Sequence, residues 1–256
     1  MAKEEQPGTG LPPGVEIAWG LRERPGKGPA RGLNVERIVA AAIGIADKEG
    51  LSAVSMSRVA KEVGVSTMAL YRYVAGKDDL LMLMEDAASG TPPPGPPVEE
   101  GWRAGIAHWT RAYRDVLRRH LWIVRIPIST PPLSPHGVEW MEQALAYLRG
   151  TGLHAGEQLA TLMMIDGYVR SHVSLLADID ETTKAADSSW EDVERRYWTL
   201  LAGFTDPHRF PAVTALLNSG DLEEMTAEGG VDDDADFEFS LTTILDGIHS
   251  RIQNNQ

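Results

Sequence analysis

The chain has 256 residues, a formal net charge of -13, 43% hydrophobic and 24% charged residues, and no cysteine. These values are typical of a globular protein and exclude a wholly disordered chain. The lack of cysteine excludes disulfides, thiolate metal sites and thiol nucleophiles, and it fits a reducing compartment. No apolar run is long enough for a membrane span, and no apolar segment follows the first charges as in a secretory signal. We therefore expect a cytoplasmic protein.

The charge is unevenly distributed along the sequence. Residues 22–77 contain ten Lys or Arg and five Asp or Glu, which gives this segment +5 and the remainder -18. A basic segment on an acidic protein is typical of a chain that binds a polyanion at one end. The alternative is chance clustering on a solvated face, because +5 is a modest excess.

The first 33 residues are rich in Gly and Pro and lack helical periodicity, so they are predicted to form a flexible basic arm. Four short helices are then expected at 34–50, 55–64, 66–76 and 77–88, because capping residues begin most of them and glycines end the first three. Five prolines between 91 and 97 exclude a helix there and mark a hinge or domain boundary.

Beyond the prolines the apolar spacing remains helical and the helices become longer. The segment at 155–178 is apolar on more than one face, which predicts burial on two sides. No alternating strand pattern occurs, so the chain is predicted to be all-α, with an arm at 1–33, a first domain at 34–88 and a larger helical domain at 99–256. The helices expected after the prolines lie at 99–119, 136–149, 155–178, 189–203 and 236–252.

The second and third short helices, joined through Gly64, have the proportions of a helix-turn-helix. Helical spacing turns Leu70 and Val74 inward. Outward hydroxyl, aromatic and guanidinium groups suit the edges of a DNA groove and its phosphates. The alternative is a helical hairpin whose polar side only meets water. The outward positions are Thr67, Met68, Tyr71 and Arg72.

The stretch "IVAAAIGIADKEGLSAVSMSRVAKEVGVSTMALYRYVAGKDDLL" resembles the N-terminal domain of the TetR family of bacterial transcription regulators. Its hallmark run, A-x-x-x-G-V-S-x-x-x-L-Y-x-[YH]-V/F-x-x-K-x-x-L, is satisfied from Ala60 to Leu80. The segment "FEFSLTTILDGI" also resembles the last helix of the tetracycline-repressor branch. Between about 90 and 230 the resemblance is one of architecture.

The resemblance implies a three-helix DNA-binding domain with roles for particular residues. Ser55, Met56 and Ser57 would open the helix that abuts the phosphate backbone, and Lys77 would clamp a phosphate. Tyr71 and Tyr73 would contact the backbone, although Tyr73 could instead be half-buried. Basic residues of the arm could enter the minor groove, or the arm could be a solubilising leader. The residues expected at the DNA interface are Ser55, Met56, Ser57, Ser66, Thr67, Met68, Tyr71, Arg72, Tyr73 and Lys77; the basic arm residues are Arg22, Arg24, Lys27 and Arg31.

The resemblance also implies that residues 99–256 bind a ligand and form a homodimer. A dimer is needed because two recognition helices must reach successive major grooves. The helices at 155–178 and 236–252 could form a four-helix interface between the two subunits, or they could be ordinary core helices. Aromatic and Met side chains at helical spacing are common in cores, and Asp166 or His172 could instead close a salt bridge across the dimer. The expected ligand-binding residues are Trp102, His108, Trp109, Tyr113, Met141, Met163, Asp166 and His172.

The function expected from this reading is a homodimeric, ligand-responsive transcription regulator, a repressor that a small molecule releases from palindromic operator DNA. The alternative is an enzyme or carrier with a vestigial DNA-binding domain. No enzyme activity, cofactor or metal is expected. The run "DDDADF" at 232–237 starts like a calcium loop, but it lacks the glycine at position six and the glutamate at position twelve.

Overall fold

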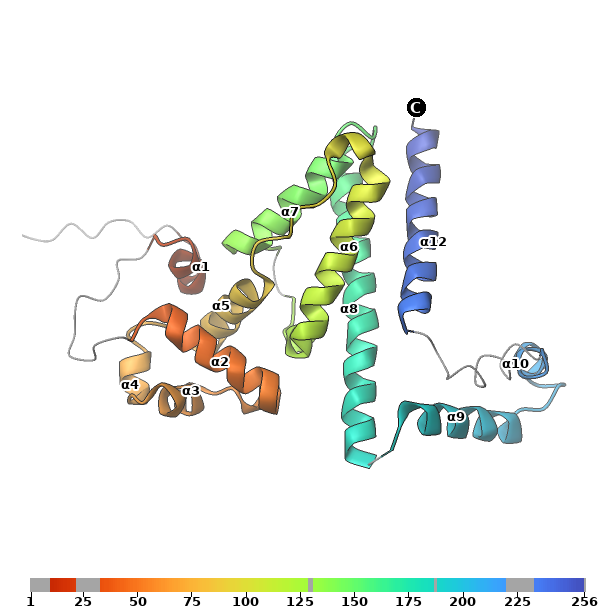
Figure 1. The fold of residues 1–256 in the computed structure, drawn as a ribbon, viewed down its shortest axis with the longest axis horizontal. Coiled ribbons are helices and arrows are strands. Elements are labelled where there is room, and N and C mark those ends of the chain that lie inside the picture. Colours follow the sequence, from red (N-terminus) through yellow and green to blue (C-terminus); the bar gives the residue numbers. More distant parts are fainter. Residues whose placement is uncertain (1–9, 22–32, 129–130, 187, 220–232, 256) are drawn as a thin grey trace, which may run out of the picture. The chain divides into compact units, whose positions relative to one another are not determined.

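The structure is a computed structural model, and it describes residues 10–21, 33–128, 131–186, 188–219 and 233–255. The elements in these ranges are all helical, which confirms the predicted all-α class (Figure 1). The chain divides into two compact units, Met1–Val173 with Asn255–Gln256, and Ser174–Asn254. This division falls within one long helix, so the boundary expected at the proline-rich segment stays a prediction.

Capping side chains fix the starts of the short helices in the first unit. Asn34 precedes α2 (Val35–Glu49), and its side chain accepts a hydrogen bond from the Arg37 amide at 2.9 Å. Ser55 and Ser66 cap α3 (Met56–Val63) and α4 (Thr67–Leu70) in the same way. The predicted starts of these three helices are therefore confirmed.

The third short helix is shorter than predicted. It ends at Leu70, and hydrogen bonds from Arg72 N to Ala69 O and from Tyr73 N to Leu70 O tighten the chain into a turn. The fourth helix, α5 (Lys77–Ser89), begins after this turn. Leu70 and Val74 are both fully buried, as predicted. The apolar spacing did not reveal the turn that separates them.

The prediction that residues 1–33 lack a helix is wrong for the part that the structure describes. Residues Pro13–Ala18 form α1, which packs on α5. The Gly14 amide donates to Asp79 Oδ1 at 2.9 Å, and a Cβ at Gly14 would lie 2.6 Å from Met82 Cε, so a glycine permits this approach. The basic arm residues Arg22, Arg24, Lys27 and Arg31 lie outside the described residues.

The rest of the first unit surrounds α6 (Trp102–Arg119), which follows the short η2 (Val98–Glu100). After η3 (Leu121–Arg125) come α7 (Pro135–Leu148) and α8 (Ala155–Ala186), the helix that continues into the second unit. Helix α7 packs on both α6 and α5. Its contact with α6 is close because Gly105 faces the ring of Tyr147.

Residues 90–97, the proline-rich segment between α5 and α6, form a strap along α7. A polyproline chain has three residues per turn, so every third carbonyl points the same way. Three α7 side chains that share one face of the helix donate to carbonyls spaced by three along the strap, which fixes the segment in place. The bonds join Trp140 Nε1 to Gly90 O at 2.9 Å, Gln143 Nε2 to Pro93 O at 2.8 Å, and the Tyr147 hydroxyl to Pro96 O at 2.9 Å.

The second unit contains the end of α8, then α9 (Trp190–Phe204), α10 (Pro211–Leu217) and α12 (Asp233–Asn254). Helix α8 runs eight residues beyond the predicted end at 178, and α10 was not predicted at all. On α12, five apolar residues at helical spacing are buried. They are Phe237, Leu241, Leu245, Ile248 and Ile252.

Replacement of Gly105 by Ala should test the close packing of α6 on α7. A Cβ there would overlap Tyr147 Cδ1, so Gly105→Ala should lower the free energy of unfolding by about 1–3 kcal/mol through overpacking. Gly44→Ala on α2 is the matched control, because nothing lies within 4 Å of its added Cβ. Urea denaturation that found the two substitutions equal would contradict this packing.

Candidate DNA-binding face and ligand cavity

The turn between α3 and α4 is fixed by backbone geometry. Gly64 adopts φ 76° and ψ 34°, a left-handed conformation that favours glycine, and the Val65 amide donates to Ala60 O at 2.9 Å. The fully buried side chain of Leu70 anchors α4 in the core of the domain. The two short helices are thus held at one angle, with one side of α4 open to solvent.

The open side of α4 and of the following turn presents side chains suited to DNA. Met68 is 76% exposed and Tyr71 is 46% exposed, and Arg72 is exposed beside them. An exposed methionine offers an apolar contact of the kind that a thymine methyl accepts, and an arginine can bond guanine or phosphate. Thr67 and Tyr73 are half-buried, and Ser66 is exposed.

The start of α3 is less open than the sequence indicates. The Met56 side chain is buried, so this residue offers only its backbone amide, whereas Ser57 is exposed and its Oγ lies 3.2 Å from Ser55 Oγ. Arg58, part of the basic segment, binds Glu62 at 2.6 Å and Glu49 at 2.9 Å. These carboxylates compete with phosphate for it, so the basic segment overstates the charge offered to DNA.

A packed aromatic cluster lies between α6 and α7 in the first unit. The ring centroids of Trp109 and Tyr113 are 5.3 Å apart, and Trp140 lies 5.7 Å and 5.6 Å from them. Trp109 Nε1 donates to Trp140 O at 2.9 Å. All three side chains are buried, and they bring α6 and α7 together as a rigid pair.

A polar network extends from this cluster to α5. The Tyr113 hydroxyl donates to Asp166 Oδ1 at 2.9 Å, and the same oxygen accepts from Arg170 Nε at 3.3 Å. Arg170 Nη2 in turn donates to Glu85 Oε1 at 2.7 Å. Burial, with the nearby charge of Asp166, raises the pKa of Tyr113, so its hydroxyl stays a donor at any pH near neutrality.

Two further carboxylates tie the helices of the first unit together. Asp86, at the end of α5, accepts from the His136 amide at 2.9 Å and lies 3.0 Å from His136 Nδ1. Asp47 of α2 accepts from Trp122 Nε1 at 2.6 Å and lies 2.8 Å from His120 Nδ1. The first contact joins α5 to α7, and the second joins α2 to η3.

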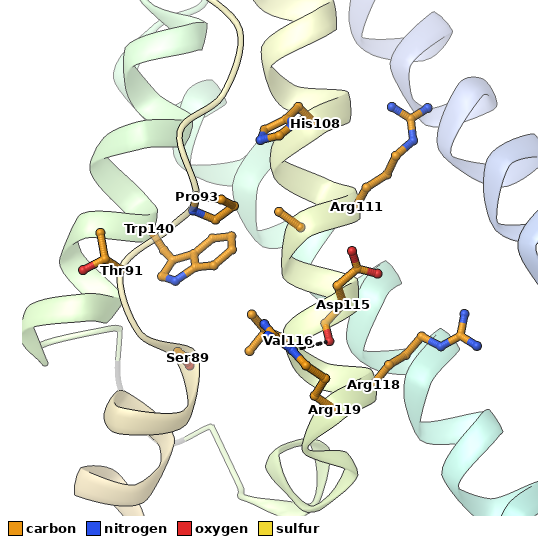
Figure 2. Close-up of a pocket in the computed structure, with 11 residues that line it drawn as sticks. Ser89, Thr91, Pro93, His108, Arg111, Asp115, Val116, Arg118, Arg119 and Trp140 are labelled. Carbon is orange, nitrogen blue, oxygen red and sulfur yellow. Dashed lines mark hydrogen bonds between the residues drawn. The ribbon is translucent and has the colours of Figure 1, made fainter. Parts of the chain in front are cut away.

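A cavity of about 730 Å³ lies between the strap and α6 (Figure 2). Its walls are the end of α5 and the strap at 89–93, the face of α6 from His108 to Arg119, and Trp140 of α7. The lining includes three arginines and one aspartate, so the formal charge is +2 with histidine neutral. This volume lies within the range of small-molecule sites, and the lining is more polar than is usual for them.

Among the described residues, no group of three His, Cys, Asp or Glu side chains is placed to hold a metal. No helix in the described part of the chain is long and apolar enough to cross a membrane.

Sequence comparison gives matches over nearly the whole chain. Residues 38–83 match the model for "Bacterial regulatory proteins, tetR family", and residues 94–252 match the model for "Tetracyclin repressor-like, C-terminal domain". The chain belongs to the TetR family. It is 36% identical over 244 residues to the HTH-type transcriptional repressor DrrR1 of Streptomyces coeruleorubidus, covering 91% of this chain and 84% of that protein.

Solved structures of the TetR family share its fold. Apo ActR from Streptomyces coelicolor is similar with a TM-score of 0.68 and 26% identity, covering 88% of this chain and 98% of ActR. The complex of ActR with actinorhodin gives a TM-score of 0.69 and 27% identity over 86% and 97% of the two chains. The helical order described above is thus that of known TetR-family proteins.

The eight ligand-binding residues predicted for this TetR-family chain do not all meet in one place. His108 lines the cavity, whereas Trp109, Tyr113 and Asp166 belong to the aromatic cluster and polar network. Their contact with a ligand stays a prediction. Trp102 and Met141 are half-buried, His172 is half-buried with its ring 6.1 Å from that of Tyr168, and Met163 is 75% exposed.

Sequence reasoning missed the cavity residues on the polar side of α6. Arg111 and Arg119 recur at helical spacing with His108, a pattern that resembles an ordinary solvated face. Ser89 and Thr91 flank the prolines and read as loop residues. One signal in the sequence could have indicated these residues. Helix α6 is rich in arginine although the chain as a whole is acidic.

Lys77→Ala should weaken binding to all DNA sequences alike. The exposed Lys77 begins α5 beside the α4 turn, and removal of one phosphate contact should lower the salt slope of binding by about one unit.

Thr67→Ala should instead change preference at one base position. Arg149→Ala, an exposed change at the end of α7, should alter neither. Fluorescence anisotropy over a salt series measures both effects, and a specificity change without a slope change would reject the phosphate role of Lys77.

Proposed function

We propose that this TetR-family protein is a homodimeric transcription repressor that binds operator DNA through α3 and α4 and is released by a small molecule. The single observation that carries the proposal is the connection between its two surfaces. Helix α5 begins at Lys77, beside the exposed side of α4, and ends at Ser89 in the wall of the cavity. A ligand in the cavity therefore contacts the helix that supports the DNA-binding face.

The relatives support this function. DrrR1 is named as an HTH-type transcriptional repressor, and ActR has been crystallised with actinorhodin. In our proposal, residues 34–88 contact DNA and residues 99–256 bind the ligand and form the dimer. The DNA contacts are those expected from the sequence, with Met56 acting through its amide alone and the side chains of Thr67, Met68 and Arg72 reaching the groove.

Exposed apolar residues support the dimer. In the first unit, α8 exposes Leu159, Met163 and Met164, with Met163 at 75%. In the second unit, α12 exposes Phe239 at 75%, while the stripe from Phe237 to Ile252 named above is buried. Apolar side chains that recur on the solvent side of long helices are typical of a surface that a second subunit covers.

The net charge of -13 fits this proposal because only one surface needs to meet DNA. Asp78 and Asp79 follow Lys77 directly, and Asp79 is engaged by the Gly14 amide. The acidic remainder of the chain repels DNA, so binding is restricted to the α3–α4 face.

An enzyme or carrier remains the rival function, and DNA binding separates the two. The decisive measurement is a gel shift with purified protein and the DNA that flanks its own gene at low salt. Slower migration of this DNA, together with protection of a palindromic sequence in a footprinting assay, supports the repressor. A protein that ignores this DNA and turns over or sequesters a metabolite would support the rival.

Glu85→Gln should reduce the response of DNA binding to ligand. The substitution weakens the charged bond from Arg170 to α5 and keeps the side-chain volume. Coupling between the sites is expected to change DNA affinity about 5–150-fold, and loss of this bond should reduce that factor at least about fivefold. Anisotropy on operator DNA, with a ligand found by thermal-shift screening, measures the factor. Glu99→Gln in η2 is the control, and a full response in Glu85→Gln would exclude the network from coupling.

Met163→Glu should weaken the dimer without unfolding the subunit. The side chain is already 75% exposed, so the charge costs little in the monomer but is desolvated on association. We expect at least about a tenfold higher dimer dissociation constant by analytical ultracentrifugation, with unchanged circular dichroism. Ile128→Glu, at 65% exposure, is the control. An unchanged dimer would place the interface elsewhere.

A further inference from the structure

One ring nitrogen at the cavity beside the strap has no partner. Nε2 of His108 is buried, and it makes no hydrogen bond to any residue that the structure describes. His108 lines the cavity, and Figure 2 shows its ring on the side of α6 that faces the strap. A buried ring nitrogen without a partner is unfavourable. A molecule in the cavity that supplies the missing hydrogen bond would therefore bind favourably there.

The strap holds the His108 ring in place without using its nitrogen. A Cβ at Gly95 would lie 3.0 Å from His108 Cδ2 and would overlap the Tyr147 hydroxyl, so glycine lets both side chains contact the strap. The Tyr147 hydroxyl donates to Pro96 O at 2.9 Å. Tyr147 thus uses its polar atom to fix the strap, whereas His108 packs beside the strap and leaves Nε2 unbonded.

The wall around His108 favours an uncharged partner. Its neighbours in the lining include Ala112, one turn further along α6, and Pro93 of the strap. Both are apolar, so an ionised group buried beside them would be unfavourable. Arg111 and Arg118 already interact with other groups of the chain. The remaining arginine of the lining is matched by its one aspartate, so the wall has no net charge free for an ionised ligand.

We propose that the effector is an uncharged molecule with a hydroxyl or carbonyl oxygen that hydrogen-bonds to His108 Nε2, and that His108 selects the effector by this oxygen. The inference rests on the proposed function for the release of DNA, but not for binding itself. A neutral imidazole carries its proton on either ring nitrogen, so Nε2 can donate to a carbonyl oxygen and can donate to or accept from a hydroxyl. A purely apolar molecule would leave Nε2 without a partner, and the site would discriminate against it for that reason.

His108→Phe tests the unused nitrogen in the absence of any ligand. Phenylalanine keeps a planar ring and removes the buried atom that lacks a partner, so the melting temperature of the protein should stay equal or rise. His120→Phe is the matched control, because it breaks the contact of His120 Nδ1 with Asp47 Oδ1 at 2.8 Å and should lower the melting temperature. A clear fall for His108→Phe would mean that a buried water or another structural partner satisfies Nε2, and it would overturn the inference.

Three probes with one carbon skeleton test the class of ligand. Borneol carries a hydroxyl, camphor carries a carbonyl, and camphane has no oxygen; the cavity of about 730 Å³ accommodates each of them. Nuclear magnetic resonance on the full-length protein with isotopically labelled histidine follows His108 Nε2 directly. Its resonance should respond to an oxygenated probe and much less to camphane. In His108→Phe, the affinity for the oxygenated probes should fall at least about fivefold relative to camphane, because their oxygen loses its bond. Arg149→Gln, exposed and outside the cavity, should retain the wild-type affinities.

The outcomes separate this inference from the proposed function. A response to borneol alone identifies a hydroxyl ligand, and a response to camphor alone identifies a carbonyl ligand. No response of Nε2 to either, or an equal change for all three probes in His108→Phe, overturns the inference even if the protein binds its operator. Failure of the wild type to bind DNA overturns the proposed function, while the titration still decides the site. Release of operator DNA by an oxygenated probe from the wild type but not from His108→Phe supports both.

Discussion

Carboxylates on α5 fix the helix that runs from the α3–α4 face to the cavity. Asp79 accepts from the Gly14 amide of α1, Glu85 binds Arg170 of α8, and Asp86 caps α7 at His136. Arg170 is the most constrained partner, because its side chain is only 15% exposed and a desolvated guanidinium must keep its anions. Helix α5 also buries Leu80, Leu83 and Met84, so these directional bonds act together with apolar packing. Bonds of this kind have discrete alternatives, which is what a switch between two states requires.

The sequence allowed the DNA-binding half to be predicted in detail because its rules are local. Asn34, Ser55 and Ser66 are capping residues next to the helices they start, and Gly64 supplies the left-handed turn. The carboxylate contacts of Arg170 could not be predicted in this way. Asp166 and Glu85 are 81 positions apart in the chain, and nothing in the local pattern of either indicates a shared arginine.

Errors in the prediction have the same origin. Helix α1 is only six residues long, and its attachment to Asp79 across 65 positions stabilises a segment whose Gly and Pro content favours a loop. The sequence pattern predicts a pocket at Trp109 and Tyr113, because aromatic residues with helical spacing are typical of a pocket as much as of a core. In the structure these rings pack on Trp140, and the open volume lies on the arginine side of α6. Whether these aromatic side chains pack on each other or line a pocket depends on the neighbouring helix α7. The local sequence of α6 gives no information about how α7 packs on it.

The strap explains why a proline-rich segment joins the two functional parts. A flexible linker would let α5 and α6 move independently, and the ligand response that we propose would then be lost. Prolines restrict the backbone, and the three bonds from α7 hold the strap at carbonyls 90, 93 and 96. The segment therefore behaves as a short stiff rod whose first residue ends α5 and whose body walls the cavity. Trp140 holds this rod at Gly90 and also borders the cavity. In our proposal, a ligand in the cavity therefore acts close to the contact that positions the end of α5.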